Sequence, residues 1–60
     1  MKFKHKFFKD EARALEFNAQ VKGTLCFKED WEYELELRTI EYSEGLKEEF
    51  DYLVIWTEEE

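Results

Sequence analysis

Residues 31–42 read WEYELELRTIEY, and the fold prediction depends on this stretch. Its first seven residues alternate strictly between apolar side chains and carboxylates, with Trp31, Tyr33, Leu35 and Leu37 set against Glu32, Glu34 and Glu36. Successive side chains of a β-strand point to opposite faces, so a period of two is the pattern of a half-buried strand. The stretch therefore predicts a strand with one apolar face and one row of carboxylates.

The alternation breaks toward its end, because Ile40 and Tyr42 fall on the opposite parity. The following 43–45 segment, SEG, is a turn signal, and a last strand is expected from about residue 46 to 57. A β-bulge at Arg38–Thr39 would restore the register, because a bulge sets two residues opposite one. A competing interpretation makes Glu44–Phe50 a helical turn capped by Ser43.

The bulged register collects the large apolar side chains into one predicted core. This core consists of Trp31, Tyr33, Leu35, Leu37, Phe50, Tyr52, Val54 and Trp56 with Leu25 and Phe27, beneath Leu15 and Ala19. In the same register the carboxylate row lies on the face away from the core. The row Lys2, Lys4 and Lys6 has the same spacing, and the two rows would neutralise each other if their strands were close.

The N-terminal half reads as a strand, a helix and a second strand. KFKHKFFK (2–9) alternates lysines with aromatic residues, and Asp10 is a plausible N-cap for the helical pattern that follows. That helix ends near Lys22, with Gly23 as the expected C′ residue, and Thr24–Lys28 reads as a strand. The sequence thus predicts a single α+β domain over 1–60, in the order β-α-β-β-β. One helix packs on an antiparallel-rich sheet, and residues 58–60 form an acidic tail.

The expected helix is apolar on two sides. One stripe holds Ala12, Leu15 and Ala19, and the nearly opposite stripe holds Ala14, Phe17 and Val21. In one interpretation only one stripe is buried and the helix end frays. In the other, one stripe meets the sheet and the second meets a partner.

Composition excludes several classes of protein. The chain has 60 residues, of which 43% are hydrophobic and 18% aromatic, so it is no disordered acidic tail. No apolar run approaches the ~20 residues of a membrane span, and none has the form of a signal peptide. The single cysteine, Cys26, cannot form an internal disulfide, which indicates an intracellular chain. We therefore expect a cytoplasmic protein without membrane contact.

The sequence offers few groups for catalysis. It has one histidine, His5, one cysteine, Cys26, and no glycine-rich phosphate loop. His5 and Cys26 make half a zinc site at best, and the acidic segments lack the aspartate-rich loop of calcium sites. We expect no enzyme, no catalytic residues, no metal and no cofactor. The basic and aromatic residues at 2–9 are those of an outer strand, so direct nucleic-acid binding is not expected either.

Charge is segregated along the chain. Residues 1–28 carry seven Lys and Arg against three acids, whereas residues 29–60 carry two against thirteen, within an overall charge of −7. Such a field attracts a partner of opposite sign. The sequence predicts a non-catalytic binding module that docks an acidic sheet face, through Glu32, Glu34, Glu36 and Asp51, on a basic site of a partner protein. The carboxylates either mimic nucleic acid there or simply solvate the face.

Two further expectations concern relatives and assembly. In general appearance, and by no motif, the chain looks like the small acidic proteins with which phages inhibit host factors. Leu53 and Ile55 fall on the predicted outer face without cover, which indicates a homodimer through that face or through the edge of the last strand. The alternative function is a structural assembly subunit whose acids confer only solubility.

Overall fold

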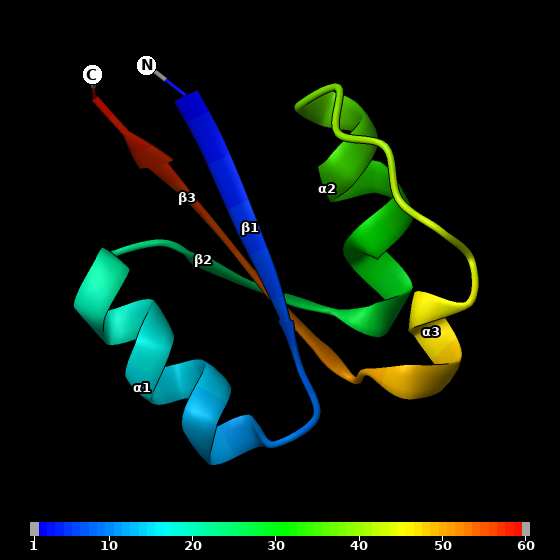
Figure 1. Ribbon diagram of the computed structural model, residues 1–60, viewed down its shortest axis with the longest axis horizontal. Coiled ribbons are helices and arrows are strands. Elements are labelled where there is room, and N and C mark those ends of the chain that lie inside the picture. Colours follow the sequence, from blue (N-terminus) through cyan, green and yellow to red (C-terminus); the bar gives the residue numbers. More distant parts are fainter. Residues whose placement is uncertain (1, 60) are drawn as a thin grey trace.

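Three strands form one antiparallel sheet, with the C-terminal strand in the middle (Figure 1). The structure is a computed structural model, and it describes residues 2–59. Strands β1 (Lys2–Phe8) and β2 (Thr24–Phe27) each pair with β3 (Tyr52–Glu58), giving the order β1-β3-β2. Because β3 is central, its residues 52–55 are paired on both sides and offer no free edge for the expected homodimer. Of the predicted acidic tail, Glu58 ends β3 and Glu60 lies outside the described residues.

Helices cover both faces of this sheet. Helix α1 (Glu11–Val21) lies on one side, and α2 (Trp31–Leu37) with the short α3 (Leu46–Glu49) lies on the other (Figure 1). A 3₁₀ turn, η1 (Lys28–Asp30), joins β2 to α2. The predicted class, a small α+β domain with a helix on an antiparallel sheet, is confirmed, and the predicted order is followed roughly. The difference is that helices occupy the place of one predicted strand.

Helix α1 begins and ends close to the predicted residues. The Asp10 carboxylate accepts a hydrogen bond from the Ala12 amide at 2.9 Å, which confirms the predicted N-cap. At the other end the left-handed residue is Lys22, with φ 53°, and Gly23 follows it without a positive φ. The prediction of Gly23 as the C′ residue was therefore wrong by one position. Glycine is required at 23 for space, because a Cβ there would lie 2.5 Å from the Ile55 carbonyl oxygen.

The predicted strand at 31–42 is wrong, and its first seven residues form α2 instead. Residues spaced by four lie on the same side of a helix, so a period of two in sequence produces two opposite apolar stripes. Trp31 and Leu35 are fully buried against the sheet, whereas Tyr33 and Leu37 are 66% and 63% exposed on the other side. The proposed bulge and its strand pairings are consequently absent.

Helix α2 ends in a Schellman motif centred on Thr39. The Ile40 amide donates to the Leu35 carbonyl at 2.9 Å, and the Thr39 amide donates to the Glu36 carbonyl at 3.0 Å. Ile40 packs on the core cluster that contains Leu35, which is the hydrophobic contact typical of this motif. The motif requires a left-handed residue, and Thr39 adopts φ 54° although it is β-branched.

Thr39→Gly should therefore stabilise the protein. A non-glycine residue in the left-handed region costs roughly 1–2 kcal/mol, so glycine should raise the free energy of unfolding by about 1 kcal/mol after its own entropy cost. Urea denaturation measures this change. Ser43→Gly, at a residue without a positive φ, is the matched control and should destabilise slightly. In a strand at 31–42, glycine at 39 would weaken the protein, so a loss of stability would contradict a helix that ends at this residue.

The segment before β3 follows the competing interpretation of the sequence. Residues 46–49 form α3, and the Leu46 amide donates to the Ser43 carbonyl at 3.1 Å. The Ser43 side chain makes no capping bond, so only the helical turn itself is confirmed. The last strand is accordingly shorter than predicted, because it begins at Tyr52.

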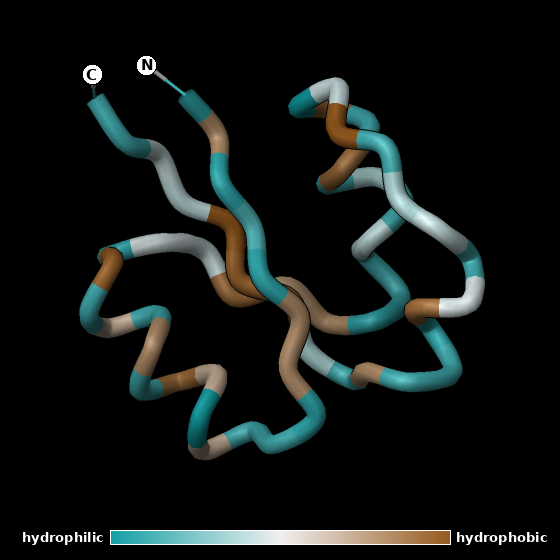
Figure 2. The backbone as a smooth tube through the Cα atoms, in the orientation of Figure 1, coloured by the Kyte–Doolittle hydropathy of each residue, from teal (hydrophilic) through white to brown (hydrophobic). Residues whose placement is uncertain are grey.

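The core lies on both faces of β3, whose middle is hydrophobic in Figure 2. Leu53, Val54 and Ile55 are consecutive and are all at most 2% exposed, which requires cover on both sides of the sheet. On the α1 side, Val54 and Ala14 are fully buried, and Phe17 meets Trp56 at 5.0 Å between ring centroids. The helix thus buries its Ala14 stripe, and Leu15, predicted in the core, is 50% exposed.

The second face of the sheet holds the larger cluster. It consists of Cys26, Trp31, Leu35, Leu53 and Ile55, with Phe7, Ile40, Tyr42 and Phe50 packed against it. Leu53 and Ile55 were expected on an uncovered outer face, and this expectation was wrong because α2 covers them. The pairing of Leu25 with Val54 and of Phe27 with Tyr52 does put these four residues on one face, as predicted.

Candidate docking surface

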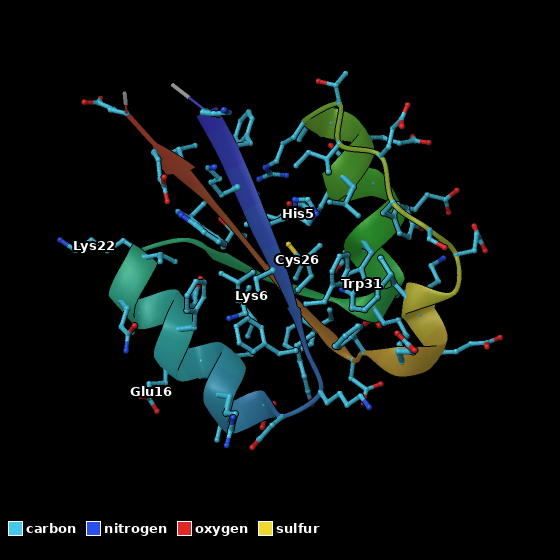
Figure 3. The ribbon with its side chains drawn as sticks, in the orientation of Figure 1. His5, Lys6, Glu16, Lys22, Cys26 and Trp31 are labelled. Atoms are coloured by element: carbon cyan, nitrogen blue, oxygen red, sulfur yellow. The ribbon has the colours of Figure 1, made fainter. Side chains whose placement is uncertain are left out.

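Carboxylates gather on the layer that α2, α3 and their connection form. Figure 3 shows oxygen-tipped side chains along this side of the molecule. We call residues 28–51 the acidic layer; its exposed acids are Glu29, Asp30, Glu32, Glu36, Glu41, Glu44, Glu48, Glu49 and Asp51. With Glu34 these are ten acids against Lys28, Arg38 and Lys47, a net charge of −7. Residues 2–27 carry six Lys and Arg against three acids, a net charge of +3. Residues 52–59 add Glu58 and Glu59 to the sheet, so the sheet and α1 are close to neutral and the excess of negative charge lies in the acidic layer.

The four predicted partner-binding residues do not form a row. Glu32 and Glu36 are exposed and share one flank of α2, because they are four residues apart. Glu34 lies on the opposite flank, toward the sheet, and Asp51 lies beyond α3 at the start of β3. The lysine row is on the α1 side of the sheet, since Lys4 and Lys6 pair with Trp56 and Val54. The two rows therefore do not neutralise each other.

Glu34 has a structural position rather than a surface one. Its carboxylate is 2.9 Å from Arg38 Nη1, and the side chains of this i,i+4 pair are only 21% and 16% exposed. Arg38 Nη1 also donates to the Glu34 carbonyl at 2.8 Å, and its guanidinium lies 5.6 Å from the Phe3 ring centroid. This arrangement fastens the end of α2 to β1. The i,i+4 spacing of Glu34 and Arg38 is a helix signal that was present in the sequence.

Asp51 is engaged in an ion pair with Lys28 at 3.0 Å, with side-chain exposures of 62% and 39%. Exposed pairs of this kind contribute little to stability, because water screens them. The pair does, however, neutralise part of the charge that was assigned to partner binding. Glu32 and Glu36 thus remain as the predicted site residues that face solvent on α2.

The exposed side of α2 has an apolar centre. Tyr33 and Leu37 are four residues apart and are the two most exposed large apolar side chains described, at 66% and 63%. Glu32 and Glu36 lie beside them on the same outward side, at neighbouring angular positions of the helix. The sequence prediction missed this surface because it placed Tyr33 and Leu37 in the core. A helical reading of the same pattern would have found it.

The lone cysteine is buried between the sheet and α2, close to Trp31 (Figure 3). Its Sγ lies 3.8 Å from Glu34 Oε2 and 3.8 Å from the Thr24 carbonyl. Burial, followed by the Glu34 carboxylate, raises the pKa of the Cys26 thiol to about 11. The thiolate is the reactive form, so Cys26 is a poor nucleophile at neutral pH.

Alkylation of Cys26 by iodoacetamide should accordingly be slow. At pH 8 the raised pKa leaves a thiolate fraction at least about 100-fold below that of an ordinary cysteine. Glu34→Gln should speed the reaction, because it removes the second cause of the shift. Mass spectrometry of the native and urea-unfolded protein measures both rates. Equal rates in the two states would show that the thiol is accessible in the folded protein.

The same shift has a consequence for stability. The unfolded chain ionises its thiol near pH 9 and the folded chain near pH 11, so the stabilising contribution is complete below pH 9 and is lost as the pH rises through this window. Wild type should lose stability there more steeply than Cys26→Ala does. Urea titrations at both ends of the window measure the difference.

The surface has a groove between β1 and α1. Phe8, Arg13, Glu16, Phe17 and Gln20 line this open groove of about 400 Å³. Lys6 Nζ lies 5.4 Å and 5.3 Å from the centroids of the Phe8 and Phe17 rings. The lysine thus already occupies the aromatic faces, as in intramolecular cation–π contacts.

Among residues 2–59, no three His, Cys, Asp or Glu side chains are grouped so that they could hold a metal ion. Within the same range, no helix has the length and hydropathy that crossing a bilayer requires. Comparison with protein-family models, with curated proteins and with solved structures found no match to this chain. The function of the chain must therefore be inferred from its own geometry.

Proposed function

We propose that this chain is a non-catalytic protein-binding module, a small inhibitor or regulator that docks its acidic layer on a basic site of a partner protein. The observation that carries the proposal is the outward side of α2, where Tyr33 and Leu37 stand exposed beside Glu32 and Glu36. Protein interfaces concentrate binding energy in a few central aromatic and apolar residues inside a polar rim. Here the apolar centre provides affinity, and the carboxylates select a partner surface of positive charge.

The charge distribution supports this assignment. The acidic layer has a net charge of −7, and two of its three cations, Lys28 and Arg38, are held in ion pairs. A field of one sign on one side of a molecule orients it during encounter and speeds association with a surface of the opposite sign. Salt screens this contribution, so association should slow as the ionic strength rises.

Affinity capture with matched baits tests the proposal. Wild type, Tyr33→Ala/Leu37→Ala and Glu32→Gln/Glu36→Gln are immobilised separately, and the proteins retained from one cell extract are quantified by mass spectrometry. Partners of this surface should be retained by wild type and reduced at least about 30-fold by the apolar double variant, because removing hot-spot residues typically costs 2 kcal/mol or more. The charge double variant should mainly slow their association and weaken its salt dependence.

Two control baits distinguish the surface from general stickiness. Leu15→Ala removes an apolar side chain that is 50% exposed on α1, and Glu16→Gln/Glu59→Gln makes the same charge change outside the acidic layer. Both should retain the partner as wild type does. The proposal would be contradicted if the control baits lost the partner as strongly as the test variants do. It would also be contradicted if the retained protein bound through an acidic site.

Nucleic-acid mimicry is the narrower form of this function. In that form the basic site of the partner is one that otherwise holds DNA or RNA, and the carboxylates of the acidic layer occupy it. A fluorescent oligonucleotide bound to the purified partner should then be displaced by wild type and not by the Glu32→Gln/Glu36→Gln variant. A stable complex of partner, oligonucleotide and this protein would eliminate mimicry and leave plain docking.

A further inference from the structure

The two edges of the sheet differ in what covers them. On β2 the Cys26 carbonyl accepts a hydrogen bond from Trp31 Nε1 at 3.1 Å, and the Thr24 carbonyl accepts one from the Cys26 thiol at 3.8 Å. These two residues have the same parity, so their carbonyls point to the same side of β2. Two of the four carbonyls of β2 thus already accept hydrogen bonds from side chains of its own domain.

The β1 edge is longer and open. Strand β1 has seven residues and pairs on one side with β3, and within residues 2–59 no other strand lies on its outer side. In the view of Figure 1 it crosses in front of the sheet, with α1 and α2 to either side. An edge strand presents every second backbone amide and carbonyl for pairing with another chain.

We propose that this edge binds an extended segment of a partner protein whose acidic residues alternate with apolar ones, by adding it as a fourth strand. Strand addition of this kind takes its affinity from main-chain hydrogen bonds and its specificity from alternate side chains. The β1 edge is separate from the outward side of α2, so this binding would be additional to the docking of the acidic layer.

Side-chain chemistry on β1 specifies such a partner. Lys4 and Lys6 point to the α1 side of the sheet, away from the acidic layer, and would lie beside the alternate acids of an added strand. The opposite side of β1 carries Phe3, which is 44% exposed, and His5, which is also exposed. The apolar residues of the partner segment would meet these two rings.

A second copy of this chain does not fit the same edge. Antiparallel pairing about a twofold axis sets residues of equal parity opposite each other, so the lysines of both copies share a face. Every such pairing that joins five or more residues of β1 opposes lysines directly: Lys2 to Lys6 with Lys4 to itself, Lys4 to Lys6, or Lys6 to itself. Like charges directly opposite destabilise a sheet, whereas opposite charges stabilise it.

Binding of synthetic peptides to isotope-labelled protein tests the proposal. The probe alternates glutamate with valine over the length of β1, and its counterpart alternates lysine with valine. The glutamate peptide should protect β1 amides from hydrogen exchange and bind at least about tenfold more tightly than the lysine peptide. Two further glutamate peptides carry N-methyl groups on one or the other set of alternate amides. One of these two should lose binding and the other retain it, because only one set faces β1.

A charge reversal provides the matched pair of variants. Lys4→Glu should weaken the glutamate peptide by about tenfold or more and strengthen the lysine peptide. Lys22→Glu makes the same change in net charge at the far end of α1, and should alter neither (Figure 3). The proposal would be overturned if the glutamate and lysine peptides bound equally tightly, or if both N-methylated peptides still bound. It would also be overturned if the two charge-reversal variants had equal effects. If raising the protein concentration protected the β1 amides from exchange without any peptide, the edge would bind a second copy of this chain. That result would also overturn the proposal.

Discussion

Trp31→Ala should leave most of the protein unfolded in water at 25 °C. The indole is fully buried, meets Phe7 at 5.1 Å between ring centroids, and donates to the Cys26 carbonyl at 3.1 Å. Truncating a buried tryptophan costs roughly 3–5 kcal/mol, and the orphaned carbonyl adds to this. A domain of this length has a total stability of only about 3–9 kcal/mol. Circular dichroism and urea denaturation would show the loss.

Two companion variants make this result specific. Tyr33→Ala, on the exposed side of the same helix, should change the free energy of unfolding by no more than about 0.5 kcal/mol. Trp31→Phe keeps most of the ring but removes the N–H donor, and should fall between the other two. If 31–37 were a strand with one apolar face, Trp31→Ala and Tyr33→Ala would be similarly damaging. If Trp31→Ala and Tyr33→Ala lowered the free energy of unfolding equally, residues 31–37 would not form a helix with one buried and one exposed apolar stripe.

Gly23→Ala should destabilise the protein although alanine is the smallest possible change. A Cβ at residue 23 would lie 2.5 Å from the Ile55 carbonyl oxygen and 3.0 Å from Trp56 Cβ. Because the nearest of these atoms belongs to the backbone of the central strand, the chain must shift to make room. Overpacking of this kind costs roughly 1–3 kcal/mol or more. Urea denaturation measures the change.

The other glycine is the matched control. A Cβ on Gly45 would meet only Ser43 Oγ, at 3.7 Å, and Gly45 has φ −60° and ψ −21°, which alanine adopts readily. Gly45→Ala should stabilise the protein by about 0.4–1 kcal/mol, because it restricts the unfolded chain. The two identical substitutions are thus expected to have opposite signs. A neutral Gly23→Ala would show that α1 and β3 are not in close contact at this point.

The candidate site was only partly predictable. The segregation of charge is a property of the sequence, and it located the acidic half of the protein correctly. The ion pairs of Glu34 with Arg38 and of Asp51 with Lys28 were not foreseen, because they depend on the helix and on the approach of residue 28 to residue 51. The exposed pair Tyr33 and Leu37 was missed because a strand reading turns both inward. The side of α2 that meets the sheet decides which of its apolar stripes faces solvent. Amino-acid composition does not determine that side.

The sequence determined those parts of the fold in which the local residue pattern fits only one kind of secondary structure. Lysine–aromatic alternation specified β1, the Asp10 cap began α1, and the α+β class followed from both. Residues 31–37 were ambiguous, because a period of two over seven residues serves a strand and also places i,i+4 pairs on two sides of a helix. Glutamate and leucine favour the helix locally, but by a small margin.

Tertiary structure decided that ambiguity. Leu53 and Ile55 on β3, with Cys26 and Phe7 on the flanking strands, make one face of the sheet apolar over all three strands. A fourth strand beside them would have left that face in water, whereas a helix lying across it buries Trp31 and Leu35 on top of it. Burial of apolar surface on that scale outweighs the small difference in local propensity. The sequence by itself therefore determined the class, the first helix and the distribution of charge, and the need to cover the second face of the sheet decided α2.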